Sequence, residues 1–302
     1  MDKEIQLNIG RSFFLKRERI SAQCVCCGSE NLLSSPAVLM PFIAHRSFGW
    51  KPVIIDDSWE LSTIKNGHAY SICNSLCCSE CKFLFLDIRF SDSELARLYD
   101  DYRGTDYTQV RELYEPGYTL RNEQLKSGVG YIKDIEDFLE PHLRFPINIL
   151  DWGGDTGKNT PFKTRNEQLH IFDISNKEVI AGAKIVSKDE AWANQYTLVV
   201  CSNVLEHVPY PSDVLSDIVK SMDADSILYL ELPLEEIVSA DHDNLHLKKK
   251  HWHEHINFFT EKSLRCLLEN VGLAVIDLKK LSVTTEGKGA FLFQLACKLS
   301  NI

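Results

Sequence analysis

The chain has 302 residues, 44% of them hydrophobic, and its 33 Lys and Arg against 43 Asp and Glu give a formal net charge of −10. This length and hydrophobic content suffice to bury a substantial core in one or two domains. The acidic balance argues against broad binding to nucleic acid, which requires clustered cations. No cationic and apolar leader opens the chain, and no apolar run approaches the roughly 20 residues of a membrane span. We therefore expect a cytoplasmic protein.

Seven of the ten cysteines fall within the first 81 residues, in two groups that each contain a C-x-x-C step. Two such steps supply four thiolates to one tetrahedral Zn²⁺, so we predict a zinc site formed by Cys24, Cys27, Cys78 and Cys81. Three neighbouring cysteines are alternative ligands: Cys26, Cys73 and Cys77. The other interpretation is a set of buried structural thiols, whereas disulfides are disfavoured in a reducing compartment. We expect residues 36–59 to form extra strands that pack on the two knuckles.

A capping box from Ser91 to Glu94 predicts a helix over residues 95–102. Five tyrosines follow closely, interleaved with arginines: Tyr99, Tyr102, Tyr107, Tyr114 and Tyr118. Tyr99 and Tyr102 fit one helix face, and the remainder lie in a stretch with glycine and proline that we expect to be a loop. Such a loop suits substrate contacts, with simple packing of the rings as the alternative.

From about residue 122, helical and strand patterns alternate, which predicts a doubly wound α/β sheet. We expect a helix over 121–139 and strands over 147–151, 169–173, 183–186, 196–201 and 226–232. Thr260 is expected to cap a helix that ends at Gly272, followed by a hairpin-like pair over 273–278 and 290–298.

The most informative segment begins at Asp151, where a short apolar run ends in a carboxylate and a glycine-rich loop follows. Glycines in such a loop allow a ligand to approach the backbone. The second strand also ends in an acid, Asp173, which can accept hydrogen bonds from a ribose diol, and the fourth is followed by Asn203. We expect a ligand to contact residues at these strand ends: Asp151, Gly153, Gly154, Asp155, Gly157, Asp173, Ile174 and Asn203. Asp155 either faces a cationic part of the ligand or caps a short helix beginning near Thr156.

The order Asp-x-Gly-x-x-x-Gly resembles the first motif of class I S-adenosylmethionine (SAM) methyltransferases. The run Ser202-Asn203-Val204-Leu205-Glu206-His207-Val208 resembles their fourth-strand motif. Together the motifs favour SAM over a dinucleotide. The resemblance implies a Rossmann-like, seven-stranded α/β sheet of order 3-2-1-4-5-7-6, preceded here by a small zinc-binding domain.

The segment from His251 to Thr260 holds three histidines that alternate with other residues, and one carboxylate, Glu254. It follows the fifth strand, at the edge of the sheet where a methyl acceptor is expected. A histidine there can act as a general base near neutral pH. Metal binding is a less favoured interpretation because no HExxH spacing is present. A third interpretation is that these are solvated loop histidines without a catalytic role. Lys248, Lys249 and Lys250 either neutralise an acceptor phosphate or form solvated surface.

The whole layout resembles bacterial SAM methyltransferases with an N-terminal zinc-binding domain, best known as sugar C-methyltransferases. The resemblance implies that His255 is the base and Glu254 its neighbour, with an assisting hydroxyl from Tyr102, Tyr99 or Tyr107. His253 is an alternative base. Those enzymes carry a further C-terminal domain, which we expect this chain to lack.

We expect a SAM-dependent methyltransferase that acts on a nucleotide-sugar or a surface-polysaccharide precursor. The alternatives are a non-catalytic SAM-fold binding module and an O-methyltransferase of another metabolite. A nucleic-acid methyltransferase is disfavoured by the net charge and by the lack of an N/D-P-P-Y/F signature after the fourth strand. The predicted division is a zinc-binding domain over 1–90, a helical linker and lid over 91–145 and a methyltransferase domain over 146–302.

Overall fold

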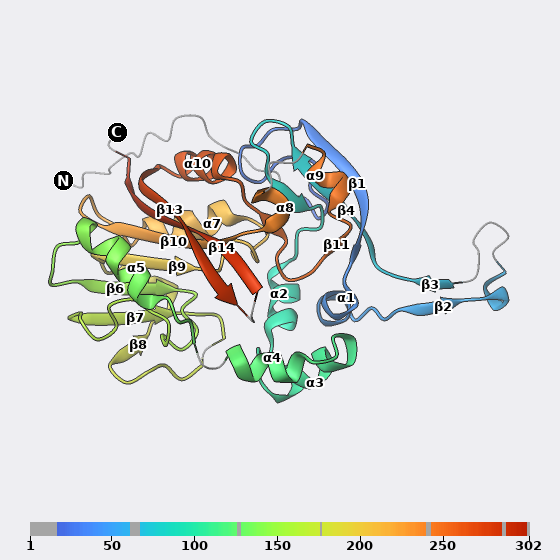
Figure 1. Cartoon of the computed structure of the whole chain (residues 1–302), viewed down its shortest axis with the longest axis horizontal. Helices are drawn as coiled ribbons and strands as arrows, with labels where there is room; N and C mark the ends of the chain where they lie inside the picture. Colours follow the sequence, from blue (N-terminus) through green and yellow to red (C-terminus); the bar gives the residue numbers. More distant parts are fainter. Residues whose placement is uncertain are drawn as a thin grey trace.

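The computed structural model describes residues 17–60, 67–125, 128–175, 177–239, 243–285 and 288–300. Its larger sheet has seven strands in the order β13-β14-β10-β9-β6-β7-β8 (Figure 1). Their bounds are β6 (Asn148–Trp152), β7 (Gln168–Phe172), β8 (Ala183–Ile185), β9 (Leu198–Ser202), β10 (Ile227–Leu234), β13 (Leu273–Thr285) and β14 (Lys288–Leu299). Numbered along the chain from β6, this order reads 3-2-1-4-5-7-6. Strand β14 pairs antiparallel with both neighbours, and the other pairs are parallel.

Both faces of this sheet are covered, as its continuously apolar strands require. On β10, Leu228 and Leu230 belong to one buried cluster, and Ile227 and Tyr229 belong to another on the opposite face. The first face packs on α7 (Pro211–Val219) and α10 (Glu261–Asn270), and the second packs on α5 (Ile132–Leu139). The short helix α6 (Lys188–Trp192) follows β8.

A second, five-stranded sheet has the order β11-β1-β4-β5-β12. Its strands are β1 (Leu32–Leu39), β4 (Ile72–Cys78), β5 (Leu84–Leu86), β11 (His251–Trp252) and β12 (Asn257–Phe258). Strand β11 pairs parallel with β1, and β12 pairs antiparallel with β5, so the late segment closes both edges of an N-terminal sheet. The loop of residues 253–256 is therefore held at both ends by strands of this sheet.

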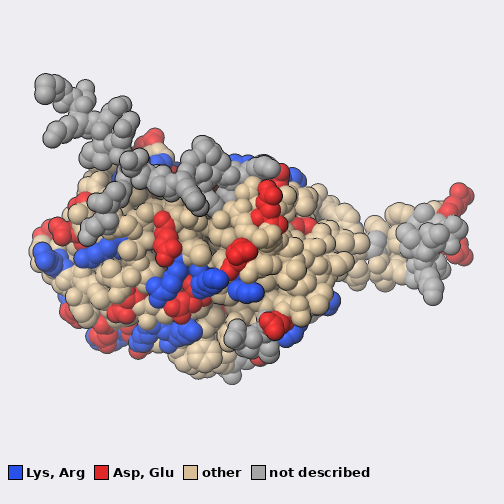
Figure 2. Space-filling view, turned by 90° about the horizontal axis from the view of Figure 1, so that it is seen from above, with Lys and Arg blue, Asp and Glu red and all other residues tan. Residues whose placement is uncertain are grey.

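Helices surround the junction between the two sheets (Figure 1). They are α1 (Pro41–Phe48), α2 (Asp92–Tyr99), α3 (Thr105–Tyr114), α4 (Tyr118–Leu125), α8 (Glu236–Ser239) and α9 (Leu245–Lys248), with 3₁₀ turns at Asp57–Trp59 and Glu140–His142. Strands β2 (Val53–Ile55) and β3 (Gly67–Ala69) pair in an arm that projects from the body of the molecule (Figures 1 and 2). Within the described part of the chain, no helix is both long and apolar enough to cross a membrane.

Several local predictions are confirmed. Helix α2 begins with the capping box between Ser91 and Glu94, but it ends at Tyr99, so Tyr102 lies in the following turn and not on the helix as expected. Thr260 caps α10, and Gly272 follows that helix with a left-handed φ of 76°. These features depend on side chains a few residues apart, which is why the sequence alone reveals them.

Other local predictions are wrong. Residues 36–59 contain helix α1 as well as strands, because Pro41 occupies its first turn and Gly49 ends it with φ 70°. The tyrosine stretch expected to be a loop contains helix α3, whose start is supported by the Asp101 carboxylate that accepts the Asp106 N–H. The single helix expected over 121–139 is two helices, α4 and α5, and Gly128 between them has φ 84°.

The glycine-rich loop after β6 also differs from expectation, because it consists of turns and no helix begins near Thr156. Gly153, Asp155 and Gly157 all have positive φ, at 84°, 50° and 76°. Left-handed residues at alternate positions cannot continue a right-handed helix. Asp155 is therefore not a helix cap, and its carboxylate pairs with Lys177 at 2.9 Å.

Candidate active site

A cavity of about 1190 Å³ opens at the carboxyl ends of β6, β9 and β10. Its wall includes the glycine-rich loop and the loop between β11 and β12. Residues of α3, α4, α5 and α8 and of the strands β13 and β14 also line it. The cavity therefore lies at the sheet edge where open α/β folds bind ligands, and it is bounded by both sheets.

Asp151 is one of the buried acids that line this cavity. It lies on β6, is 4% exposed, and accepts a hydrogen bond from the hydroxyl of Thr160. Burial raises the pKa of Asp151 to about 7, and the nearby Asp173 carboxylate acts in the same direction. A carboxyl group with a pKa near 7 is partly protonated at neutral pH, and it can lose its proton when a cationic ligand binds beside it.

The glycines of the loop are required by close packing. A Cβ atom on Gly153 would lie 2.4 Å from Cγ2 of Val204, and one on Gly154 would lie 2.5 Å from Cγ of Asp151. At Gly157 the nearest side-chain atom, in Ile171, would be 3.0 Å away. Glycine thus allows the loop to fold tightly against β7, the Asp151 side chain and the turn after β9.

Asp173 holds the loop from the end of β7. Its two carboxylate oxygens accept the N–H groups of Asp155 at 2.8 Å and Ser175 at 2.7 Å. Neither Asp173 nor the exposed Ile174 lies on the cavity wall, whereas Asp155 does. The assignment of Asp173 and Ile174 to the cofactor stays a prediction.

Asn203, after β9, lines the cavity in a left-handed conformation with φ 54°. Its side-chain amide donates to the carboxylate of Glu231 at 3.1 Å. Glu231 on β10 is 1% exposed and also accepts hydrogen bonds from Ser202, Tyr131 and Tyr229. Sequence reasoning missed Glu231, although a carboxylate within an apolar strand was a visible signal.

His255 lies on the cavity wall, and Glu235 after β10 orients it. The Nδ1 atom of His255 is 2.7 Å from a carboxylate oxygen of Glu235. Although burial favours the neutral ring, Glu235 and the nearby Glu206 raise the pKa of His255. Because the carboxylate accepts the proton on Nδ1, the Nε2 atom remains available for proton transfer.

Glu254 lies beside His255 on the same wall and forms a charged network with α3. Arg111 donates to its carboxylate at 2.8 Å, and the hydroxyl of Tyr107 donates to the same oxygen. Burial opposes ionisation of Glu254, but Arg111 and His253 lower its pKa to about 2. Glu254 is therefore a fixed negative charge at neutral pH.

The alternative base, His253, points elsewhere. Its Nε2 atom contacts the carboxylate of Glu115, and Arg111 lies 3.4 Å from the same nitrogen. His253 is not on the cavity wall. Alternation along an extended segment predicts that His253 and His255 share one face. In the structure, only His255 of these two lines the cavity.

Tyr102 lines the cavity, and its ring packs edge-on against Tyr99 and Tyr107. Burial raises the pKa of Tyr102 to about 12, so its hydroxyl keeps its proton near neutral pH. The Tyr99 hydroxyl instead lies 3.0 Å from Nδ1 of His207. The three tyrosines that the sequence could not distinguish therefore have different partners.

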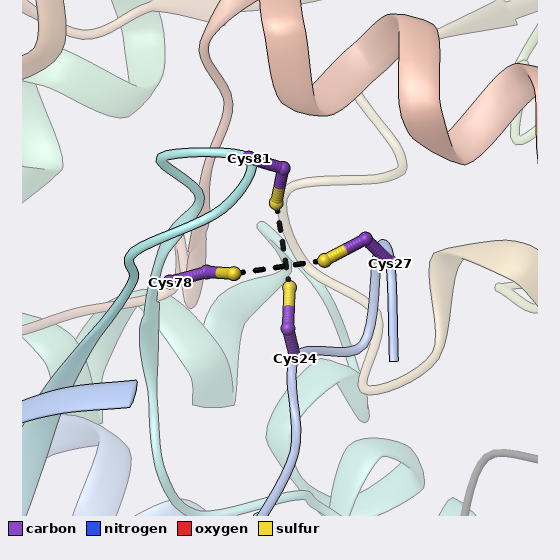
Figure 3. Close-up of side chains that lie close together, drawn as sticks. All are labelled: Cys24, Cys27, Cys78 and Cys81. Atoms are coloured by element: carbon purple, nitrogen blue, oxygen red, sulfur yellow. Dashed lines mark hydrogen bonds between the residues drawn. The ribbon is translucent and has the colours of Figure 1, made fainter. Parts of the chain in front are cut away.

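The four cysteines of the two C-x-x-C steps converge on one point (Figure 3). The Sγ atoms of Cys24 and Cys81 are 3.5 Å apart, those of Cys27 and Cys78 are 3.6 Å apart, and all four lie within 4.8 Å of one another. A tetrahedral zinc with Zn–S bonds of about 2.3 Å requires sulfur separations of about 3.7 Å. The described side chains of Cys26, Cys73 and Cys77 are outside this cluster.

A family model described as a methyltransferase domain matches residues 122–278. A search of curated proteins finds no match.

Among solved structures, the N1-methyltransferase of 1,6-didemethyltoxoflavin from Burkholderia thailandensis is similar with 14% identity and a TM-score of 0.46, covering 65% of this chain and 90% of its own. The magnesium protoporphyrin IX methyltransferase of Synechocystis PCC 6803 has 17% identity and a TM-score of 0.44, covering 66% of this chain and 97% of its own. A SAM-dependent methyltransferase from Methanosarcina mazei has 18% identity and a TM-score of 0.42, and the match covers 54% of this chain and 98% of its own.

The assignment rests on the family match, which spans more than half of the chain and contains the glycine-rich loop after β6 and the turn after β9. The protein accordingly belongs to the methyltransferase-domain family and is a SAM-dependent methyltransferase.

Proposed function

We propose that this enzyme methylates a small saccharide acceptor, a nucleotide-sugar or a surface-polysaccharide precursor, with His255 as general base. The observation that carries the proposal is the single cavity that joins the glycine-rich loop to Glu254 and His255. SAM supplies a methyl group bound to a cationic sulfur. The buried acid Asp151 and the close-packed loop at Gly153 and Gly154 fit that cofactor, with Asp155 and Asn203 on the same wall.

The base proposal is supported by the partners of His255. Glu235 orients the ring through Nδ1 and leaves Nε2 for the acceptor. His255 would take the acceptor proton at Nε2 as the methyl carbon leaves the sulfur and bonds to the acceptor atom. The fixed charge of Glu254 would favour the resulting imidazolium. Tyr102, which keeps its own proton and lines the same cavity, would donate a hydrogen bond to the acceptor.

The acceptor class is supported by cationic side chains on the cavity wall. Arg103, Arg111 and Arg121 line the cavity together with Tyr102 and Tyr118, and Arg111 also pairs with Glu254. Guanidinium groups suit the phosphates of an activated sugar. The three consecutive lysines at 248–250 do not line the cavity, and Lys249 lies over the ring of Phe258 at 4.2 Å.

We also propose that Cys24, Cys27, Cys78 and Cys81 bind a structural zinc ion. Their sulfur separations fit a tetrahedral site, and the cysteines come from two knuckles that hold adjacent parts of the N-terminal sheet. Four protein ligands leave no open position, so the ion would stabilise the fold and take no part in methyl transfer.

The experiment is methyl transfer from radiolabelled SAM to a panel of nucleotide-sugars, with SAM affinity measured separately by titration calorimetry. His255→Ala is expected to lower turnover by about 10²–10⁴-fold, the usual contribution of a positioned base. SAM affinity should change little, because the proposed cofactor contacts lie on other segments of the cavity wall, after β6 and β9. His253→Ala, two residues away on the same loop, is the matched control and should cost far less.

Full turnover in His255→Ala, or equal losses in both variants, would contradict the base. SAM binding without transfer to any acceptor on the panel would contradict the saccharide class. That second outcome favours the binding module or the O-methyltransferase of another metabolite.

A further inference from the structure

Three potential metal ligands meet on the cavity wall, away from the cysteine cluster. Glu206 and His207 lie in the turn after β9, and His255 lies between β11 and β12. One ligand atom from each lies within 4.8 Å of the other two. Two segments about 50 residues apart in sequence therefore bring together two imidazoles and one carboxylate.

Glu206 is the unusual member of this group. It has no exposed surface, and neither of its carboxylate oxygens has a hydrogen-bond partner among the described residues. Nε2 of His207 is 3.8 Å away, and burial lowers the pKa of that histidine to about 3, so it carries no charge to offset the carboxylate. Arg111 is engaged with Glu254 and Glu115. A buried carboxylate without a partner is costly, and a bound cation would remove that cost.

Both histidines are held in the manner typical of metal ligands. Nδ1 of His255 faces the carboxylate of Glu235. Nδ1 of His207 lies 3.1 Å from the carbonyl oxygen of Glu254 and 3.0 Å from the hydroxyl of Tyr99, and both oxygens can accept its N–H. Histidines that donate one ring N–H to a carboxylate or carbonyl present the other nitrogen, with its lone pair, to a metal. Glu206, His207, His255 and Glu235 all border the cavity, so open coordination positions would face the ligand space.

We propose that Glu206, His207 and His255 form a second metal site that binds Zn²⁺ or a similar divalent transition-metal ion. Two imidazole nitrogens and one carboxylate oxygen form a ligand set that zinc accepts with an open fourth position. Bonds of about 2.0–2.2 Å require ligand separations of about 3.4 Å, so the side chains must close by at most about 1.4 Å when the ion binds. The side chain of His255 is 38% exposed, and its ring packs edge-on against that of His207 at 4.7 Å between centroids.

The second site has a consequence for catalysis that rests on the function proposed above. Nε2 of His255 has a single lone pair, which can take either a metal ion or the acceptor proton. Occupation of the site therefore inhibits methyl transfer. The metal-bound and catalytic forms are alternative states of the same side chains.

The binding experiment uses the full chain with its cysteine cluster already loaded with zinc, titrated with Co²⁺. The expected result is one further equivalent that shows visible ligand-field absorption without a sulfur-to-metal charge-transfer band. Glu206→Gln and His255→Ala should abolish that equivalent. Glu235→Gln, which removes an outer partner, should weaken it by about 10–100-fold. His253→Ala is the control and should bind as the wild type does.

Absence of the second equivalent in the wild type would overturn the site, as would its survival in both Glu206→Gln and His255→Ala. The activity experiment separates the site from the proposed function. Added Zn²⁺ should inhibit methyl transfer, and a chelator should restore it. If Zn²⁺ binds at these residues and does not inhibit, the base assignment fails and the site stands. If nothing binds and His255→Ala is inactive, the site fails and the base assignment stands.

Discussion

At the scale of single residues, burial decides the chemistry of the cofactor end of the cavity. Asp151 is almost completely buried, and its carboxylate accepts a hydrogen bond from the Thr160 hydroxyl. Its pKa of about 7 lies above the ordinary value of 3.8. The folded protein therefore keeps a proton that the unfolded chain has released, and the stability contributed by Asp151 falls as pH rises from about 4 to about 7.

SAM binding should reverse this effect. A cationic ligand favours the ionised carboxylate, so binding should lower the pKa of Asp151 and release a proton near pH 6 to 7. SAM affinity should accordingly rise with pH across that window. Calorimetry in buffers of different ionisation enthalpy measures the released protons, and Asp151→Asn should release none from this position. Equal proton release in both proteins would contradict the contact.

At the scale of elements, the glycine-rich loop requires glycine both for its left-handed backbone conformation and for the lack of room for a Cβ atom. Gly153 has φ 84°, and a Cβ atom there would meet Val204 at 2.4 Å. Gly182 has a similar φ of 87°, but nothing lies within 4 Å of its added Cβ. An alanine at Gly182 therefore tests backbone strain alone, and an alanine at Gly153 tests backbone strain together with steric conflict.

Gly182→Ala should lower the free energy of unfolding by about 1–2 kcal/mol, the cost of a left-handed alanine. Gly153→Ala should cost more and should also weaken SAM binding, because the turn after β9 must move. Denaturant unfolding of both variants measures the difference. The double change Gly153→Ala with Val204→Ala should recover the steric part, and no recovery would show that conformation alone requires the glycine.

At the scale of the whole molecule, the cysteine knuckles and the methyltransferase sheet share one core. Cys24, Cys78 and Phe83 belong to the same buried cluster as Leu230 of β10 and Leu267 of α10. The segment over 251–258 also supplies both edge strands of the N-terminal sheet. Damage at the cysteine cluster should therefore spread to the sheet that binds SAM.

Purified protein should contain about one tightly bound zinc per chain, and Cys81→Ser should lose it. Because the core is continuous, Cys81→Ser should unfold in one transition at lower denaturant concentration, with SAM affinity reduced. Cys73→Ala, a buried cysteine outside the cluster, should retain the zinc. Separate unfolding of an N-terminal part, with the SAM site intact, would contradict this coupling.

Elements that depend on neighbouring residues could be predicted from the amino-acid sequence. Apolar runs revealed the strands of the large sheet, and caps such as Ser91 and Thr260 marked helix starts. The C-x-x-C steps identified the four cysteines, because each knuckle is a local structure. The loop from Asp151 to Gly157 indicated the ligand-binding edge for the same reason.

Contacts between side chains from distant segments could not be predicted, because they depend on how the whole chain packs. Glu206 and Glu235 have no local motif that joins them to His255, and Arg111 reaches Glu254 across 143 residues. Likewise, β11 and β12 are too short to be recognised by periodicity, and their partner strands β1 and β5 hold the loop that carries His255. Burial, pairing and charge at this site arise from packing between the two sheets, and no short stretch of sequence contains that information.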